Sequence, residues 1–482
     1  MTAPTNASIV EHFQTLEDPR IARTKKHNLL DILVIAVCTL LTGGEGFQDM
    51  ELFGKSKRAW LQTFLVLPHG IPSHDTFGRV FARLNPQRFQ ECFLAWTQAV
   101  AQLTQGALIS LDGKTVRASF DRATASSPLH MLSAWCSDQG GLVIGQLKTD
   151  SKSNEITVIP ELLHLLAIKG CIVTIDAMGC QTAIADQIRT QGGDYLLALK
   201  ANHTKAYTAV KQYFHHHIEH QLAWRTAEHF FDAFDNSHGR TVRRRVWAIT
   251  DLTTLPELSK WPDLQSVIVV ETIRMAHQHA PVTSDYRFYL ASLVRSATAF
   301  VTLIRQHWDI ENKLHWSLDV TFNEDRCRIR KDHAAENMVA LRHITLNLLR
   351  QESSRRIRLR QKRLLCSLDE HDLLTVIAQS NLRCDHPADV PCLLHVSACT
   401  RCETLPTLVR RGLIGRPDVP DRADIADGIR GRPTADDLGS DRAGLLLGAR
   451  TIRVLRHLTP PRSAQAPPAR APAPPQARRP AA

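Results

Sequence analysis

Apolar positions in the first hundred residues recur at helical spacing. Leu29 to Val37 form a mostly apolar segment that Gly43 and Gly44 close. Ser73 offers an N-cap for a helix through Leu84, whose apolar residues lie three and four positions apart. Asn85-Pro86 ends that helix. We therefore predict a helical N-terminal domain over residues 9–100.

The hydrophobic period changes near residue 105. Short apolar runs typical of strands now alternate with helical patterns, in the order strands 107–111, 130–135 and 142–148, helix 158–168, strand 171–175, helix 180–191 and strand 195–199. Three neighbouring strands followed by alternating helices and strands indicate a ribonuclease-H-like α/β layer. The predicted fold class is a mixed sheet with flanking helices, within a domain over residues 105–380.

Two further patterns lie inside and after this domain. Residues 202–296 are predicted to be a β-rich insertion with strands near 241–249, 267–273 and 287–293. A long helix then begins near Ala297, and further helices are expected over 334–350 and 369–379. Residues 381–482 contain no lysine and are rich in Arg, Pro and Ala, so they are predicted to form a disordered tail.

Composition narrows the function classes. Lys plus Arg number 59 against 48 Asp plus Glu, and the formal charge of +11 favours a polyanionic partner. No apolar run reaches the length of a membrane span, and Met1 to Ser8 lack the features of a signal peptide. We expect a cytoplasmic protein with reduced cysteines, Cys38 and Cys171 among its core residues.

Two predicted strands end in an acid. Asp112 follows the run ending at Leu111, and Asp176 follows the run ending at Ile175. If the strands are neighbours, the two carboxylates lie close together, which is costly unless a cation such as Mg²⁺ lies between them. A single aspartate at a strand end more often caps a turn or a helix. The pattern alone therefore leaves a metal site and two turn residues as alternatives.

Phosphodiester cleavage with two metal ions requires more ligands than two aspartates provide. Glu311, on the long helix after Ala297, is the best candidate for a third acid, because helix packing can direct it toward the strand ends. Trp308 and Trp316 flank it. At helical spacing these two are more typical of core residues than of platforms for a displaced base.

Six segments, in the expected order over residues 10–380, resemble a known family. They are LEDPR at 16–20, PSHDTF at 72–77, LDGK at 111–114, IDAMGCQ at 175–181, YLLALK at 195–200 and RQHWDIENKLHWSLDVTFNED at 305–325. The chain resembles the H-repeat-associated transposases, a DDE insertion-sequence family also found beside Rhs elements. The segment after residue 380 shows no such resemblance.

The resemblance implies a metal-binding, catalytic triad of Asp112, Asp176 and Glu311. It also implies the ribonuclease-H-like domain with its β-rich insertion and the helical N-terminal domain. Related transposase families place a Tyr, an Arg and a Lys around the catalytic Glu, where this chain has Ile304, His307 and Leu318. That departure leaves Asp319 and Glu324 open as alternatives to Glu311.

The expected function is DNA transposition: recognition of element ends, metal-dependent endonuclease cleavage and strand transfer, with Mg²⁺ as cofactor and Mn²⁺ as a substitute. The partners are double-stranded transposon ends and target DNA, in the nucleoid, with a homodimer in the synaptic complex. Basic residues expected to contact DNA are Lys114, Lys200, Arg243, Arg244, Arg245, Arg305, Arg356 and Arg360.

Two other functions remain as alternatives. One is a catalytically inactive, DNA-binding relic of such an element, which the unusual tail favours and the presence of all three acids opposes. The other is a ribonuclease-H-like nuclease without a joining step. Cys384, Cys392, Cys399 and Cys402 lack the paired spacing of a zinc knuckle.

Overall fold

A computed structural model describes residues 9–101, 103–120, 127–149, 155–219, 225–226, 228–237, 240–275 and 283–378. All of them belong to one compact unit, residues 1–405, and the second unit, residues 406–482, contains none. The predicted tail therefore lies outside the described residues. In the part of the chain that is described, no helix is both long enough and apolar enough to cross a bilayer.

The described strands form one nine-stranded sheet in the order β3-β2-β1-β4-β5-β9-β8-β7-β6. β4 is parallel to both β1 and β5, and the other neighbouring pairs are antiparallel. The strands are β1 (Leu108–Val116), β2 (Leu129–Cys136), β3 (Leu142–Thr149), β4 (Ile172–Ile175), β5 (Asp194–Leu199), β6 (Phe230–Ser237), β7 (Arg240–Ile249), β8 (Ser266–Met275) and β9 (Thr283–Ala291). The mixed α/β class is confirmed, and the predicted β-rich segment extends the same sheet through β9.

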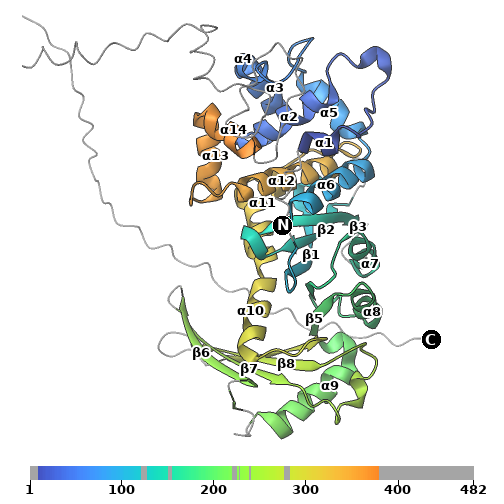
Figure 1. Cartoon of the computed structure of the whole chain (residues 1–482), viewed down its shortest axis with the longest axis vertical. Helices are drawn as coiled ribbons and strands as arrows, with labels where there is room; N and C mark the ends of the chain where they lie inside the picture. The colour runs from blue at the N-terminus through green and yellow to red at the C-terminus, as the bar shows by residue number, and fades with distance from the viewer. Residues whose placement is uncertain are drawn as a thin grey trace, which may run out of the picture. The chain divides into compact units, whose positions relative to one another are not determined.

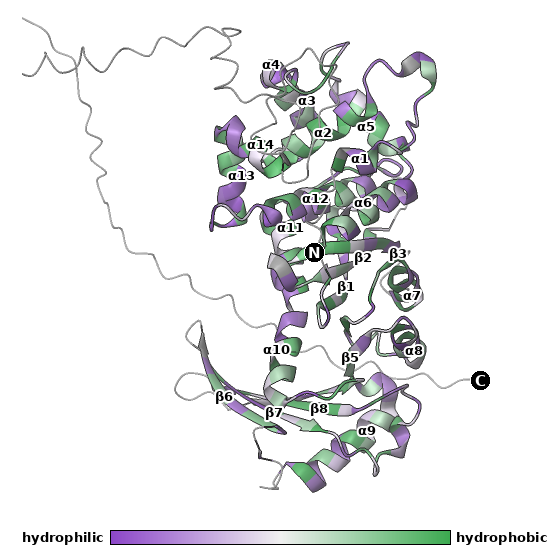
Figure 2. Cartoon of the chain, viewed as in Figure 1, coloured by the Kyte–Doolittle hydropathy of each residue, from purple (hydrophilic) through white to green (hydrophobic). Residues whose placement is uncertain are grey.

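Helices cover both faces of the sheet, as Figure 1 shows. α7 (Glu155–Leu165) and α8 (Thr182–Thr190) pack on one face, together with α9 (Thr204–Tyr213). α10 (Ala297–His307) packs on the other face, where its Phe300 and Ile304 contact a cluster that includes Leu108 of β1. In Figure 2, β2 and β8 are mainly apolar, whereas α10 carries both hydrophilic and apolar stretches.

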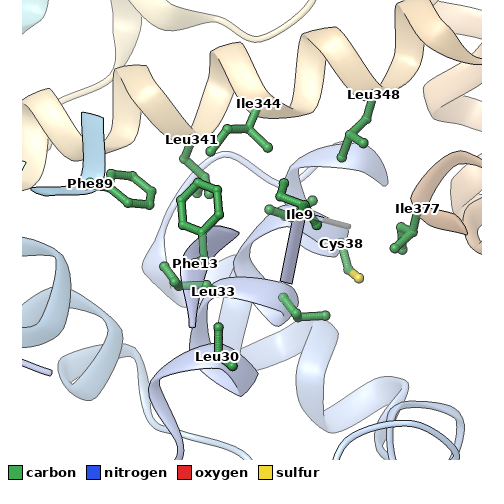
Figure 3. Close-up of a pocket in the computed structure, with 12 residues that line it drawn as sticks. Ile9, Phe13, Leu30, Leu33, Cys38, Phe89, Leu341, Ile344, Leu348 and Ile377 are labelled. Atoms are coloured by element: carbon green, nitrogen blue, oxygen red, sulfur yellow. The ribbon is translucent and has the colours of Figure 1, made fainter. Parts of the chain in front are cut away.

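The first and last helices form a shared core. They are α1 (Ile9–Phe13), α2 (Leu29–Leu41), α3 (Phe47–Ser56), α4 (Arg58–Leu61), α5 (His74–Arg83), α6 (Pro86–Val100), α12 (Ala334–Gln351), α13 (Leu359–Leu368) and α14 (Glu370–Ala378). Figure 3 shows how apolar side chains from α1, α2, α12 and α14 converge there, Phe13, Leu33, Leu341 and Ile377 among them. The N-terminal helices are thus joined to the end of the described chain.

Local sequence signals explain several helix ends. Asn85 ends α5, as predicted, and also begins α6, where its side chain accepts a hydrogen bond from the Arg88 N–H and Pro86 occupies the first turn. The long helix predicted from Ala297 is capped by Ser296 but changes after His307. It continues as a π-helical turn, η9 (Ile310–His315), and then as α11 (Trp316–Val320).

Candidate active site at the carboxyl ends of β1 and β4

The sheet brings Asp112 and Asp176 to the same edge. Leu111 of β1 pairs in parallel with Ile175 of β4, so the next residue of each strand emerges beside the other. β1 continues to Val116 because β2 still pairs with it beyond Asp112, and it is therefore longer than the predicted strand. Asp112 marks the point at which parallel pairing stops and polar side chains become accessible.

The Asp176 side chain has a structural partner as well. Its Oδ1 accepts a hydrogen bond from the Met178 N–H at 3.0 Å. The role as a turn residue, which the sequence left open, is therefore real for one oxygen of Asp176. It leaves Oδ2 available for another contact.

Glu311 approaches the two aspartates from the helical segment over β1. Ile310 and Leu314, on either side of it in the π turn, are buried in the helical core, while Glu311 itself is exposed. Burial, and then the charges of Glu311 and Asp176, raise the pKa of Asp112 to about 7. The charges of Glu311 and Asp176 therefore both reach the Asp112 carboxyl.

Two largely buried histidines of intermediate exposure stand beside these acids. His315 Nδ1 lies 3.6 Å from Asp112 Oδ2, and burial lowers the pKa of His315 to about 3. His307 Nδ1 is hydrogen-bonded to Thr174 Oγ1 at 2.9 Å, and burial lowers its pKa to about 4 against the opposing effect of Asp176. Both imidazoles are neutral at physiological pH. Sequence reasoning missed them because histidine on a helix gives no signal of its burial.

A second buried pair lies behind Asp112. His130 Nε2 and Glu155 Oε1 are 2.6 Å apart, and Thr115 Oγ1 lies 2.8 Å from His130 Nδ1. A Cβ placed on Gly113 would overlap both the Glu155 carboxylate and the His130 ring. Glycine after Asp112 is thus required by packing, which the LDGK motif alone did not reveal.

Lys114 is occupied by carboxylates. Its Nζ lies 2.8 Å from Asp319 Oδ1, 3.2 Å from Glu324 Oε2 and 3.1 Å from Asp325 Oδ1, and the side chain is only 10% exposed. Lys114 is therefore not included among the DNA contacts that we propose below, although the sequence predicted that it binds DNA phosphate. The same contacts engage Asp319 and Glu324, the two acids weighed against Glu311.

Most of the other predicted DNA contacts carry acidic partners. Arg243 pairs with Asp232, Arg245 with Glu271, and both Arg244 and Arg305 with Asp235. Lys200, Arg356 and Arg360 are exposed. Trp316 is 57% exposed, so its interpretation as a core residue was wrong.

A cleft begins beside Asp176 and follows the sheet. Its first part has a volume of about 480 Å³ and is lined by Asp176, Lys200, Arg287, His307 and Trp308, among others. A second part of about 330 Å³ shares Arg287 and Trp308 and adds Arg244, Arg274 and Arg305. The guanidinium of Arg287 lies over the Trp308 ring, 5.4 Å from its centroid. The cleft therefore carries basic and aromatic groups away from Asp176.

The donor chemistry of the site fits a hard divalent cation. Carboxylate oxygens are the ligands such ions prefer, and mutual repulsion among three acids is relieved by a cation. In the described ranges, however, no three His, Cys, Asp or Glu side chains stand close enough together to hold a metal ion as they are. Ligation by Asp112, Asp176 and Glu311 together would require these side chains to move. The cysteines considered for zinc, Cys384 to Cys402, lie outside the described residues.

Known transposases and their family models are similar to this chain. Residues 10–97 match a family model described as DDE_Tnp_1-associated, and residues 104–348 match the model of the transposase DDE domain. The H repeat-associated putative transposase YhhI of Escherichia coli K12 is 38% identical over 378 residues, which are 78% of this chain and 98% of that protein. The putative transposase YncI of Escherichia coli O157:H7 is 37% identical over 71% of this chain and 87% of its own length.

One solved structure is also similar, at 11% identity. It is a piggyBac transposase synaptic complex with hairpin DNA, with a TM-score of 0.35 over 87% of this chain and 83% of that one. That score is too low to support an argument about fold. The family model and the relatives suffice, and they show that the chain belongs to the DDE transposase family, with the H repeat-associated transposases among its relatives.

Proposed function

We propose that this transposase cuts and joins DNA at a metal site formed by Asp112, Asp176 and Glu311. The observation that carries the proposal is the parallel pairing of Leu111 with Ile175, which delivers two aspartates to one sheet edge. Glu311 acts on the same place, as the raised pKa of Asp112 indicates. Mg²⁺ is the proposed ion, with Mn²⁺ as a substitute.

The strand order supports the more specific fold assignment. β3-β2-β1-β4-β5, with β2 antiparallel to β1 and with β4 and β5 parallel to β1, is the arrangement expected of a ribonuclease-H-like core. In such a core the functional groups gather where parallel strands end. We accordingly propose residues 105–380 as the catalytic domain and residues 9–100 as its helical partner.

The proposed reaction has two phosphoryl-transfer steps. In cleavage, a water oxygen attacks phosphorus at the element end, and the 3′ oxygen leaves as a hydroxyl. In joining, that hydroxyl attacks a phosphodiester of the target, whose own 3′ oxygen leaves. Bound divalent cations would activate the attacking oxygen and stabilise the leaving oxygen.

The chain's own groups shape the site for these steps. Asp112 and Asp176 provide oxygens from a rigid sheet, and Glu311 provides one from the helical segment that crosses it. His307 and His315, neutral because they are buried, add no positive charge that would compete with a cation. No covalent protein intermediate is needed.

We propose that a DNA strand follows the cleft from Asp176. Lys200 and Arg287 would contact phosphates near the acids, and Arg244 and Arg305 would do so farther along, with Asp235 setting their orientation. Trp308, partly exposed beside Arg287, offers a face for an unpaired base. Exposed Arg356 and Arg360 are further candidate contacts, and a homodimer would hold two ends.

A test compares wild type with Asp176→Asn on a labelled duplex that carries the element's own ends, in Mg²⁺ or Mn²⁺. We expect nicking that requires metal and falls at least about a hundredfold in the variant, while DNA binding in EDTA is retained. Asp75→Asn, which removes an exposed carboxylate far along the chain, serves as the control. Unchanged cutting by Asp176→Asn would remove Asp176 from the site.

The same experiment separates the alternatives. Binding of the ends without cutting by the wild-type protein would identify an inactive relic. Cutting without joined products would identify a nuclease. The presence of all three acids favours an active enzyme over the relic, and only the joined products separate a transposase from a nuclease.

A further inference from the structure

One face of β1 carries several of the polar groups that lie near the helical segment. Leu108 packs beneath α10, and side chains alternate between the two faces of a strand. Ser110, Asp112 and Lys114 therefore share the α10 face. Ile109 and Leu111 point to the opposite face, into the core under α7 and α8.

The helical segment meets this face at three levels, the first of them through Thr174 of the neighbouring strand β4. His307 is joined to Thr174, whose hydroxyl also donates to Ser110 Oγ at 3.1 Å. His315 lies against Asp112, and Asp319 of α11 pairs with Lys114 at 2.8 Å. The contacts follow the same order along the strand and along the helix.

The spacing of the last two levels matches. Asp112 and Lys114 are two residues apart on a strand, about 6.6 Å. His315 and Asp319 are four residues apart on a helix, about 6 Å. The Lys114–Asp319 ion pair therefore opposes sliding of the helix along β1 by one residue in either direction.

Glu311 lies in the π turn between the first level and the last. A π turn contains one more residue than an α turn and is uncommon, often occurring at functional sites. Conversion of Ile310–His315 to ordinary α-helix would rotate α11, which follows the turn, about the helix axis by roughly 100° relative to α10. Contacts on both sides of the turn oppose that change.

We propose that Lys114 is a positioning residue whose ion pair with Asp319 fixes the register of the helix over β1 and so sets Glu311 against Asp112. This role rests on the proposed metal site, because the ion pair would act by setting the position of one of its ligands, Glu311. Lys114 contacts neither substrate nor metal in this role. It acts through Asp319 of α11 and, in the turn that follows α11, through Glu324 and Asp325.

The burial of the ion pairs determines which variant tests the proposal. Glu324 is 1% exposed, and its other cationic partner, Arg342, is 3.5 Å away. Removing Lys114 would leave this buried carboxylate poorly compensated and would endanger folding. Asp319 is 35% exposed, so Asp319→Asn breaks the register contact at a lower cost to the fold.

The measurement is Mn²⁺ binding by the full chain, followed as the rise in melting temperature with Mn²⁺ concentration in the absence of DNA. We expect Asp319→Asn to weaken Mn²⁺ binding roughly tenfold, as loss of an outer partner of a metal ligand commonly does. Asp319→Glu, which keeps the charge, should restore most of it. Asp309→Asn is the matched control, because it removes a carboxylate that pairs with Lys313 on the same segment and, among the described residues, forms no ion pair with β1.

Cleavage supplies a second readout. The Mg²⁺ concentration for half-maximal cutting should rise in Asp319→Asn, while the affinity for element ends in EDTA stays the same. A normal Mn²⁺ response in Asp319→Asn, alongside its loss in Asp112→Asn, would overturn the positioning role and leave the metal site intact. An equal loss in Asp309→Asn would also overturn it, and no Mn²⁺ response in wild type would overturn both.

Discussion

Asp112 is held in a surrounding that disfavours its charge. Its carboxyl is 23% exposed and faces Glu311 and Asp176, with Glu155 beyond Gly113. A carboxylate whose charge destabilises the folded protein is expected at a functional site, where binding of a cation would offset the unfavourable charge. The neighbouring His307 and His315 are neutral and so do not offset the charge of Asp112.

The raised pKa of Asp112 predicts a pH-dependent stability. Because its folded pKa, about 7, lies above the ordinary value of 3.8, the folded state holds the proton more tightly. The resulting stabilisation is complete below about pH 4 and is lost as pH rises through 7. In EDTA, Asp112→Asn should therefore be more stable than wild type at pH 8, by at most about 4 kcal/mol.

Urea unfolding at pH 5 and pH 8 measures this difference, with Asp75→Asn as the control. The gain in Asp112→Asn should be larger at pH 8 than at pH 5. A gain of the same size at both values would contradict the assigned environment of Asp112.

His343 of α12 predicts the opposite pH dependence. It is 1% exposed, and burial, followed by the charges of Lys114 and Arg342, lowers its pKa to about 3. The unfolded chain binds its proton more readily, so stability falls as pH drops from about 6.5 toward 3. His343→Leu should lessen the loss between pH 6.5 and pH 4, by at most about 3 kcal/mol. Unfolding curves measured over that range give the free energy of unfolding at each pH. The same pH dependence in His343→Leu and wild type would contradict this prediction.

Strand pairing and helix packing place the site at the scale of elements. β1 carries Asp112 at the end of its parallel pairing, and α7 approaches so closely that only glycine fits at position 113. The helical segment from α10 to α11 crosses the other face. The position of Asp112 therefore depends on how closely α7 packs on one face of β1 and the α10–α11 segment on the other.

Gly113→Ala tests the closeness of that packing. The added methyl would meet Glu155 and His130, both nearly fully buried, and a shift of either group transmits to Asp112. We expect a loss of about 1–3 kcal/mol in stability, as overpacking usually causes, and a fall in cleavage. Gly46→Ala, where the new methyl meets no other atom, is the control, and equal losses in both variants would contradict the packing argument.

Sequence patterns predicted the elements better than the contacts among them. The apolar runs before Asp112 and Asp176 indicated strands ending in acids, because strand period and burial are local properties. The partners of Lys114 lie more than 200 residues away, so no local pattern could identify them. The π turn at Glu311 was also missed, since its residues are ordinary helix formers and long-range packing selects the turn.

At the scale of the whole molecule, distant parts of the chain close one core. Leu373, Val376 and Ile377 of α14 are buried against the helices that begin the chain. The sequence predicted the helical N-terminal region and α14 separately but not their contact. It also predicted the β-rich insertion within the catalytic domain, but not that β9 would join β5 in a single sheet.

Truncation tests the boundary of the active unit. A chain ending at Ala378 keeps all of α14, and we expect its melting temperature and its metal-dependent cleavage to match those of the full chain. A chain ending at Asp369 loses three buried apolar side chains and should be several kcal/mol less stable. Loss of cleavage in the chain that ends at Ala378, with folding intact, would assign a catalytic role to residues 379–482.

The central claim is that Asp112, Asp176 and Glu311 together hold divalent metal. Anomalous X-ray scattering from crystals of the protein with Mn²⁺ and end DNA tests it most directly. We predict two Mn²⁺ peaks about 4 Å apart, bound by oxygens of these three side chains, as two-metal phosphoryl transfer requires. Mn²⁺ bound elsewhere, with Glu311 turned away from both aspartates, would contradict the account.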